Sequence, residues 1–223
     1  RREKERVGKG GYTMPEIKLG ETGDVGEVRE VGEKVIMTER LVIRPSRWEE
    51  IELFYPWEQR PEVTEFFSIR DGQTKEEVIR KFIKDDDDPS ARQFTILLKD
   101  AEGMEGAEGG AGPKPIGRIV LADIEPEWKA ELWRIYIADV QLRGKGLGKE
   151  AMLGIMDYCF NHLGLERLYL DHYTGNPAAY LYQSLGFKYE GVLRKNCRKN
   201  GVLYDVHLMS MLREEYEELY RKA

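Results

Sequence analysis

A glycine-dense turn lies between two very different stretches of this sequence. Residues 143–151 read RGKGLGKEA, with a glycine at every second position from Gly144 to Gly148. An apolar run typical of a strand, residues 132–138, precedes the turn, and an amphipathic run typical of a helix, residues 147–163, follows it. Glycines let backbone N–H groups converge on an anion, and the free N–H groups and positive dipole end of the next helix add to the attraction. The pattern predicts a phosphate-binding loop in an α/β protein.

Three kinds of phosphate loop compete for this turn. The mononucleotide loop G-x-x-x-x-G-K-[ST] is excluded, because Arg143 stands where its first glycine belongs and Glu150 replaces the magnesium-binding hydroxyl. Residues 146–151 satisfy the dinucleotide fingerprint G-x-G-x-x-A, and Asp171 stands near the distance expected for a ribose-binding acid. An NAD-dependent oxidoreductase therefore stays open as an alternative. The third pattern, [QR]-x-x-G-x-[GA], is met by residues 143–148.

The third pattern marks the pyrophosphate loop of coenzyme A dependent N-acetyltransferases, and a second segment resembles the same proteins. Residues 176–187 read NPAAYLYQSLGF and resemble the N-x-x-A-x-x-L/Y-Y-x-x-x-G-F stretch of the GNAT superfamily, at the family's spacing from the glycine turn. Residues 37–45 look like the family's first strand and residues 200–205 like its final hairpin, so the resemblance covers residues 35–212. The chain looks most similar to the branch of ribosomal-protein N-terminal acetyltransferases and spermidine acetyltransferases.

One segment departs from the family pattern. Many relatives carry a proline shortly before the glycine turn, whereas residues 139–142 here read DVQL. The register between the central strand and the turn is therefore open.

The resemblance implies a GNAT fold, an α/β (α+β) architecture with a mixed, mostly antiparallel sheet of six or seven strands and helices on both faces. The order of patterns along the chain agrees with a mixed sheet rather than with a doubly wound nucleotide-binding fold. Residues 1–34 are charged and without periodicity, so we expect a mobile N-terminal extension. Residues 35–223 are expected to form one acetyltransferase domain, interrupted by a Gly- and Glu-rich loop insertion at residues 100–114.

Local signals predict several further features. Ser46, with Glu49 three residues later, predicts the start of a helix, and Thr74 caps a second helix that ends near Lys84. Cys159 falls on the apolar stripe of the long helix, which predicts a core thiol, and Cys197 is expected in a turn. The acceptor pocket is expected near aromatic residues that could form its walls: Trp57, Phe66, Phe67 and Trp133.

Composition excludes several classes of protein. The formal net charge of -6 argues against general nucleic-acid binding, which needs a basic face. No apolar run reaches the roughly 20 residues that span a bilayer, and the first residues lack the apolar segment of a secretion signal, so we expect a cytoplasmic protein without membrane contact. The two cysteines and three histidines lack ligand spacing, so no metal site and no disulfide are expected.

The resemblance also implies which residues bind the cosubstrate, acetyl-CoA. Backbone groups of the central strand around Ile137 and Ala138 would hold the pantetheine and acyl group. Asn176 would contact the cosubstrate or cap the following helix, two roles that the sequence leaves open. The pyrophosphate would lie on the glycine turn, whose residues are Arg143, Gly144, Lys145, Gly146, Leu147, Gly148 and Lys149.

Chemistry at an amine requires a proton acceptor. An amine with a lysine-like pKa is protonated at neutral pH, and removing its proton costs on the order of 4 to 5 kcal/mol at pH 7. Glu131 is placed like the acid that several relatives use as a base, although a water chain is an alternative. Tyr182 matches the family's tyrosine, which implies that it protonates the departing sulfur.

These features predict an N-acetyltransferase that moves acetyl from acetyl-CoA to a primary amine in a ternary complex. No covalent acyl-enzyme is expected, because neither cysteine has a neighbouring histidine. A protein N-terminus, a polyamine and other small amines remain open as acceptors, and so does a homodimer. A non-catalytic acyl-CoA sensor is the alternative from another functional class.

Overall fold

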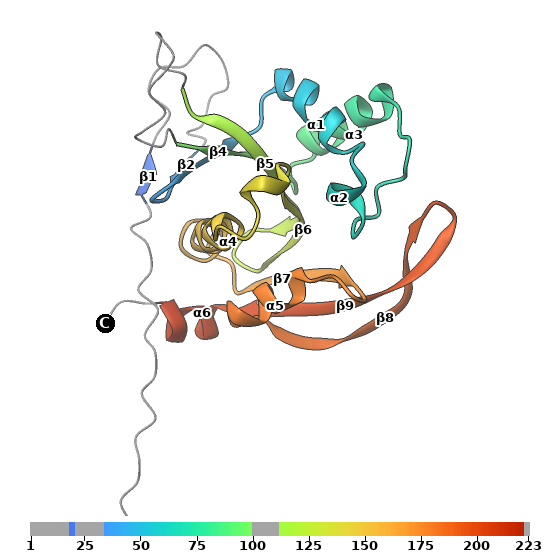
Figure 1. The fold of residues 1–223 in the computed structure, drawn as a ribbon. Coiled ribbons are helices and arrows are strands. Elements are labelled where there is room, and N and C mark those ends of the chain that lie inside the picture. Colours follow the sequence, from blue (N-terminus) through green and yellow to red (C-terminus); the bar gives the residue numbers. More distant parts are fainter. Residues whose placement is uncertain (1–17, 21–33, 100–111, 221–223) are drawn as a thin grey trace, which may run out of the picture.

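The computed structural model describes residues 18–20, 34–99 and 112–220, which form one mixed sheet with helices on both faces (Figure 1). The described strands follow the order β1-β2-β3-β4-β5-β6-β7-β9-β8, and among them β6 and β7 are the one parallel pair. The strands are β1 Lys18–Gly20, β2 Val35–Met37, β3 Leu41–Pro45, β4 Arg92–Leu98, β5 Lys114–Glu125, β6 Lys129–Ile137, β7 Arg167–Tyr173, β8 Lys188–Lys199 and β9 Val202–Leu212.

This architecture confirms the expected fold, with nine described strands in place of six or seven. The difference arises at the N-terminal edge, where β2 pairs with β3 and β1 pairs with β2. Residues 18–20 of the predicted extension are therefore part of the sheet, while the other residues up to 33 lie outside the described ones. Residues 100–111 of the predicted insertion also lie outside them, and Lys114 already begins β5.

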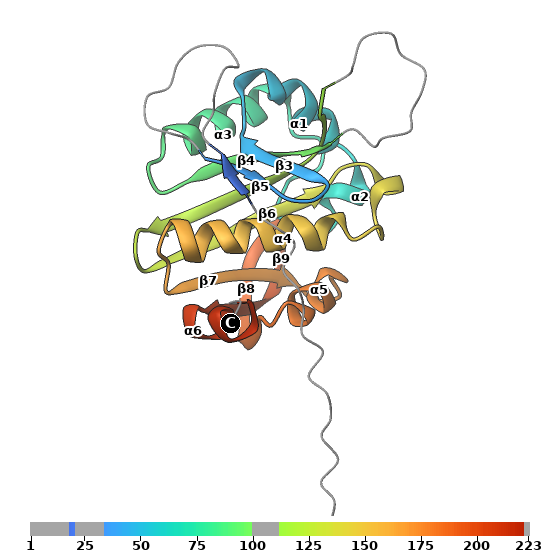
Figure 2. The same cartoon turned by 90° about the vertical axis from the view of Figure 1, so that its left-hand side faces the viewer.

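The helices divide between the two faces of the sheet. Figure 1 shows α1, α2 and α3 on one side and α4 on the other, and Figure 2 shows α4 lying across the sheet with α5 and α6 beside it. The helical segments are η1 Trp48–Glu50, α1 Ile51–Trp57, α2 Pro61–Thr64, α3 Lys75–Asp87, η2 Val140–Leu142, α4 Leu147–Asp157, η3 Tyr158–His162, α5 Ala178–Ser184 and α6 Arg213–Tyr220.

Two N-cap residues were predicted from the sequence. The structure confirms one of them and shifts the other by one residue. Thr74 caps α3 as predicted, because its hydroxyl accepts a hydrogen bond from the Glu77 N–H. The prediction of Ser46 as a cap is wrong: its N–H donates to the Gln93 carbonyl oxygen and extends the pairing of β3 with β4. The following residue, Arg47, occupies the N-cap position instead, and its N–H donates to the Glu50 carboxylate.

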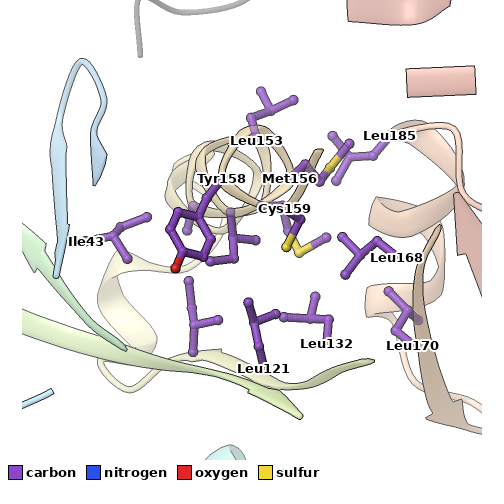
Figure 3. Packing of buried hydrophobic residues seen from close by; sticks show 14 of the residues in the cluster. Ile43, Leu121, Leu132, Leu153, Met156, Tyr158, Cys159, Leu168, Leu170 and Leu185 are labelled. Carbon is purple, nitrogen blue, oxygen red and sulfur yellow. The ribbon is translucent and has the colours of Figure 1, made fainter. Parts of the chain in front are cut away.

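The main core lies between α4 and the sheet. Figure 3 shows Cys159 on the sheet side of this helix among leucines of β6 and β7, and its exposed fraction is 0%. The predicted core thiol is confirmed. The predicted single helix changes at Tyr158 into a π-helical turn that ends at His162. A second core under α1 and α3 contains Trp57, so the prediction of Trp57 as a pocket wall is wrong.

Candidate active site

The sheet opens between its two parallel strands. β6 and β7 pair only from Lys129 to Glu131, although β6 continues to Ile137 and β7 to Tyr173. A cavity of about 570 Å³ lies where the strands separate, and both strands contribute to its walls. This volume is typical of small-ligand sites, which reach roughly 300 to 1,000 Å³. The end of one strand ladder thus creates the candidate site in the middle of the sheet.

The glycine turn forms one end of the cavity. Arg143, Gly144 and Gly148 line it, and Gly146 is the N-cap of α4, so the predicted order of strand, turn and helix is confirmed. Gly144 and Gly146 have φ angles of 73° and 80°, a region that residues with a Cβ rarely adopt. A Cβ at position 144 or 148 would meet no atom within 4 Å. The backbone of the turn therefore faces open space, which fits a cradle for phosphate oxygens.

The other predicted residues of the turn have different surroundings. Lys145, Gly146, Leu147 and Lys149 are not among the cavity-lining residues. Leu147 is buried in the main core, and the Lys145 carbonyl oxygen accepts a hydrogen bond from Arg40 Nη1 at 2.9 Å. The backbone of these residues shapes the turn, whereas their side chains do not reach into the cavity.

An ion pair that the sequence did not reveal holds the turn in place. The Glu150 carboxylate, on the first turn of α4, accepts hydrogen bonds from Thr38 Oγ1 at 2.5 Å, from the Arg40 N–H at 2.7 Å and from Arg40 Nε at 2.7 Å. Burial favours the neutral acid, but these hydrogen bonds outweigh it and lower the pKa of Glu150. The sequence offered one sign of this ion pair. Glu150 is the acidic residue in the first turn of α4, among buried residues that are otherwise apolar.

The end of β6 next to the turn presents one backbone edge to the opening between β6 and β7. The Ala138 N–H already donates to the Ile116 carbonyl oxygen at 2.8 Å, so it is engaged on the β5 side. The Ile137 carbonyl oxygen accepts from Arg143 Nε at 3.2 Å, and Ile137 lines the cavity. Neighbouring residues of a strand direct their backbone groups to opposite sides. Of the two predicted positions, Ile137 is therefore the one that faces the opening between β6 and β7.

Two residues of the α5 region reach the cavity. Tyr182 lines it with an exposed fraction of 8%, and burial, followed by the charge of Asp171, raises the pKa of Tyr182 to about 12. The tyrosine therefore keeps its proton at neutral pH. Asn176 also lines the cavity, and its Oδ1 accepts from the Ala178 N–H at 2.9 Å. The two roles predicted for Asn176, at the cavity and at the start of the helix, are compatible.

The cavity wall opposite the turn is acidic. Glu131 on β6 and Asp171 on β7 are half-buried and line it. Burial is the main reason why the pKa of Glu131 rises to about 7, and the charges of Asp171 and Asp123 raise it further. Burial also raises the pKa of Asp171. In the described part of the chain, no hydrogen bond or ion pair engages either carboxylate.

Aromatic and sulfur-containing side chains complete the lining. Phe66, Phe67 and Trp133 line the cavity as predicted. Cys197 was expected in a turn but lies in β8, opposite Tyr204, and also lines the cavity. Sequence reasoning missed this cysteine because a bulge between Leu193 and Cys197 decides which way its side chain points.

The arrangement limits the possible chemistry. A doubly wound nucleotide-binding fold needs a largely parallel sheet, so the mostly antiparallel pairing contradicts the dinucleotide alternative. Among the described residues, no three His, Cys, Asp or Glu side chains gather as metal ligands would. None of the described helices is long and apolar enough to cross a membrane.

Comparisons with known proteins identify this arrangement. The uncharacterized N-acetyltransferase p20 of Bacillus licheniformis is 28% identical over 82% of this chain and 98% of its own length. A spermidine N(1)-acetyltransferase of Vibrio cholerae is 33% identical over 45% of this chain and 58% of its own length.

Solved structures share the fold. A spermidine N-acetyltransferase from Vibrio cholerae, in complex with CoA and spermine, matches with a TM-score of 0.66 and 24% identity over 80% of this chain and 99% of that one. A GCN5-related N-acetyltransferase from Brucella melitensis matches with a TM-score of 0.67 and 18% identity over 86% of this chain and 84% of that one. The family model of the acetyltransferase (GNAT) domain matches residues 40–188. The chain therefore belongs to the GNAT acetyltransferase family and is an N-acetyltransferase with acetyl-CoA as its cosubstrate.

Proposed function

We propose that this enzyme acetylates the primary amine of a small cationic acceptor, with Glu131 as the general base and Tyr182 as the general acid. The observation that carries the proposal is the composition of one cavity. It is lined by the glycine turn, Tyr182 and Glu131. The turn follows the end of β6 and Glu131 lies near its start, so a thioester and an amine can approach each other from opposite sides. Direct transfer in a ternary complex needs this arrangement.

Proton transfer assigns separate tasks to the two residues. The acceptor ammonium loses one proton before attack, and Glu131, with a pKa of about 7, accepts it and passes it to solvent. The nitrogen then forms a bond to the acetyl carbon, and the carbon–sulfur bond breaks. Tyr182 gives its proton to the sulfur, and the second proton that the nitrogen loses restores Tyr182. One ammonium thus yields one amide, one thiol and one proton released to solvent.

The lining favours a polyamine among the acceptors that the sequence left open. Glu62 and Glu65 lie at the exposed rim, while Glu131 and Asp171 lie deeper. Four carboxylates along one cavity attract a ligand with several ammonium groups. The likeness to spermidine acetyltransferases in sequence and fold supports the same choice, and with it the polyamine side of the predicted branch.

The test is thiol release from acetyl-CoA with a panel of polyamines, monoamines and peptides, with each product identified by mass. We expect Tyr182→Phe to lower kcat by about 10²- to 10⁴-fold, the usual contribution of a general acid, with unchanged CoA affinity. Tyr180→Phe is the matched control, because Tyr180 is on the same helix with 78% of its surface exposed. Equal rates for wild type and Tyr182→Phe would remove Tyr182 from the mechanism. Binding of acetyl-CoA without thiol release for any amine would support the sensor alternative.

A further inference from the structure

Two carboxylates in the cavity have no ion-pair partner among the described residues. Glu131 and Asp171 are both half-buried, and no hydrogen bond or ion pair from the described residues engages them. Other buried acids in the described chain are paired, as Glu58 is with Arg118 and Arg134 and Glu150 with Arg40. A partly buried carboxylate without a partner costs free energy. Two such carboxylates side by side in a cavity wall therefore point to a ligand of opposite charge.

Strand register brings the two carboxylates to one face of the sheet. Glu131 is the last β6 residue paired with β7, and its partner is Tyr169. Alternate residues of a strand point to the same face, so Tyr169, Asp171 and Tyr173 share the face of Glu131. Asp171 is thus the first acid on β7 beyond the point where the strands separate.

Asp171 is also central to the cavity. Its charge acts on Glu131 of β6, on Tyr182 of α5 and on Cys197 of β8, which come from three different elements that line the cavity. The hydroxyl of Tyr173, two residues further along β7, is buried next to Cys197. A ligand next to Asp171 would therefore lie between the proposed base and the proposed acid.

We propose that Asp171 is the second carboxylate of the acceptor site and that it holds the acceptor ammonium beside Glu131, in line with the thioester that the glycine turn positions. This inference rests on the proposed function, because it assigns Asp171 to amine binding in the same cavity. Glu131 takes the proton, whereas Asp171 orients the nitrogen through a charge-assisted hydrogen bond from the ammonium.

The pH dependence of the reaction gives this role a distinct signature. Four described groups interact with Glu131. Asp171 and Asp123 raise its pKa, Tyr169, whose hydroxyl donates to Asp123, lies on the same face, and Cys197 of β8 also interacts with its charge. Replacing Asp171 by a neutral amide removes one of the charges that raise the pKa of Glu131. The base then stays deprotonated at lower pH, so the acid limb of kcat/KM moves toward lower pH.

The experiment compares wild type, Asp171→Asn and Asp171→Glu. For Asp171→Asn we expect an increase of about 10-fold or more in the KM for amines, because an ammonium loses a charged partner, together with the acid limb at lower pH. Asp171→Glu keeps the charge and should restore part of the amine affinity. Asp87→Asn, an exposed acid at the end of α3, controls for net charge and should leave both quantities unchanged.

Two further measurements separate the possible failures. Calorimetric titration of Asp171→Asn with CoA tests whether the variant is folded and still binds the cosubstrate with wild-type affinity. Calorimetric binding of spermidine to the enzyme–CoA complex tests the role of Asp171 even if the proposed acid and base prove wrong. Unchanged amine affinity and an unmoved acid limb in Asp171→Asn would overturn the inference. A uniform fall in kcat at every pH, with unchanged amine affinity, would assign Asp171 a structural role and would also overturn it.

Discussion

Glu150 shows how one side chain sets the shape of a ligand loop. It lies in the first turn of α4, where the helix dipole favours an acid, and its carboxylate binds both Thr38 and Arg40. Arg40 in turn binds the Lys145 carbonyl oxygen on the glycine turn. The turn is therefore tied to the chain before β3, more than a hundred residues earlier in the sequence.

We expect Glu150→Gln to destabilise the fold by about 1.5 to 3 kcal/mol, the usual value for a lost hydrogen bond to a charged group, and to weaken CoA binding. Urea unfolding and calorimetric titration with CoA measure the two effects. Glu39→Gln, an exposed acid next to Arg40, is the control and should change neither. Unchanged CoA affinity in Glu150→Gln would show that the turn keeps its shape without this carboxylate.

The pH dependence of stability follows from the same residue. Because the folded state lowers the pKa of Glu150, its contribution is fully present above the unfolded-state pKa of about 4.3 and is lost as the pH falls through the folded value. Wild type should therefore lose more stability than Glu150→Gln between pH 5 and the acid transition.

At the scale of elements, the β8–β9 hairpin borders the part of the cavity lined by Phe66 and Phe67, which we call the acceptor end. Asn200 and Gly201 have φ angles of 49° and 81°, as a two-residue hairpin turn requires. The turn contacts the segment around α2: Asn200 Nδ2 donates to Asp71 at 2.9 Å, and Lys199 Nζ donates to the Thr64 carbonyl oxygen at 2.7 Å. Phe66 and Phe67, which line the cavity, lie between these two contact points in the sequence.

We expect the double change Asp71→Ala and Lys199→Ala to raise the KM for amines by about 3- to 10-fold. The loss of about one or two hydrogen bonds leaves the segment that carries Phe66 and Phe67 less firmly held against the hairpin. CoA affinity should not change, since neither Asp71 nor Lys199 belongs to the glycine turn or lines the cavity. Steady-state kinetics with both substrates varied makes the comparison, with Arg198→Ala on the same hairpin as the control. An unchanged KM for amines would mean that the contact does not shape the acceptor end.

At the scale of the whole molecule, a buried charge network joins the helices of one face to the sheet. Glu58, next to the end of α1, accepts hydrogen bonds through Oε1 from Arg118 at 2.8 Å, from Arg134 at 2.6 Å and from Tyr136 at 3.1 Å. Burial favours the neutral acid, but the two arginines outweigh it and lower the pKa of Glu58. The network positions β6 beneath the helical layer, and Arg134 and Tyr136 also line the cavity.

We expect Glu58→Gln to cost about 3 to 5 kcal/mol of unfolding free energy, because it leaves two buried guanidinium groups without a negative partner. Glu52→Gln removes an exposed ion pair between Glu52 of α1 and Lys75 of α3 and should cost about 1 kcal/mol or less. Urea unfolding at neutral pH compares the two variants. Similar losses for both would contradict a special role for the buried network.

The sequence by itself determined the features that depend on neighbouring residues. The glycine turn, the cap at Thr74, the Asn200-Gly201 turn and the core position of Cys159 all follow from backbone preferences or helical spacing within a few residues. The shift of the first cap from Ser46 to Arg47 shows the limit of such signals, because pairing with Gln93 competes for the Ser46 N–H.

Only the tertiary structure decided which side chains share the cavity. The point where β6 and β7 separate, the bulge that directs Cys197 inward, and the pairing of Glu150 with Arg40 depend on contacts between residues distant in the chain. Asp171 shows the difference most directly: its spacing suggested a ribose-binding acid, whereas strand register places it beside Glu131. Local sequence specifies how a segment bends, but strand order and register specify what it faces.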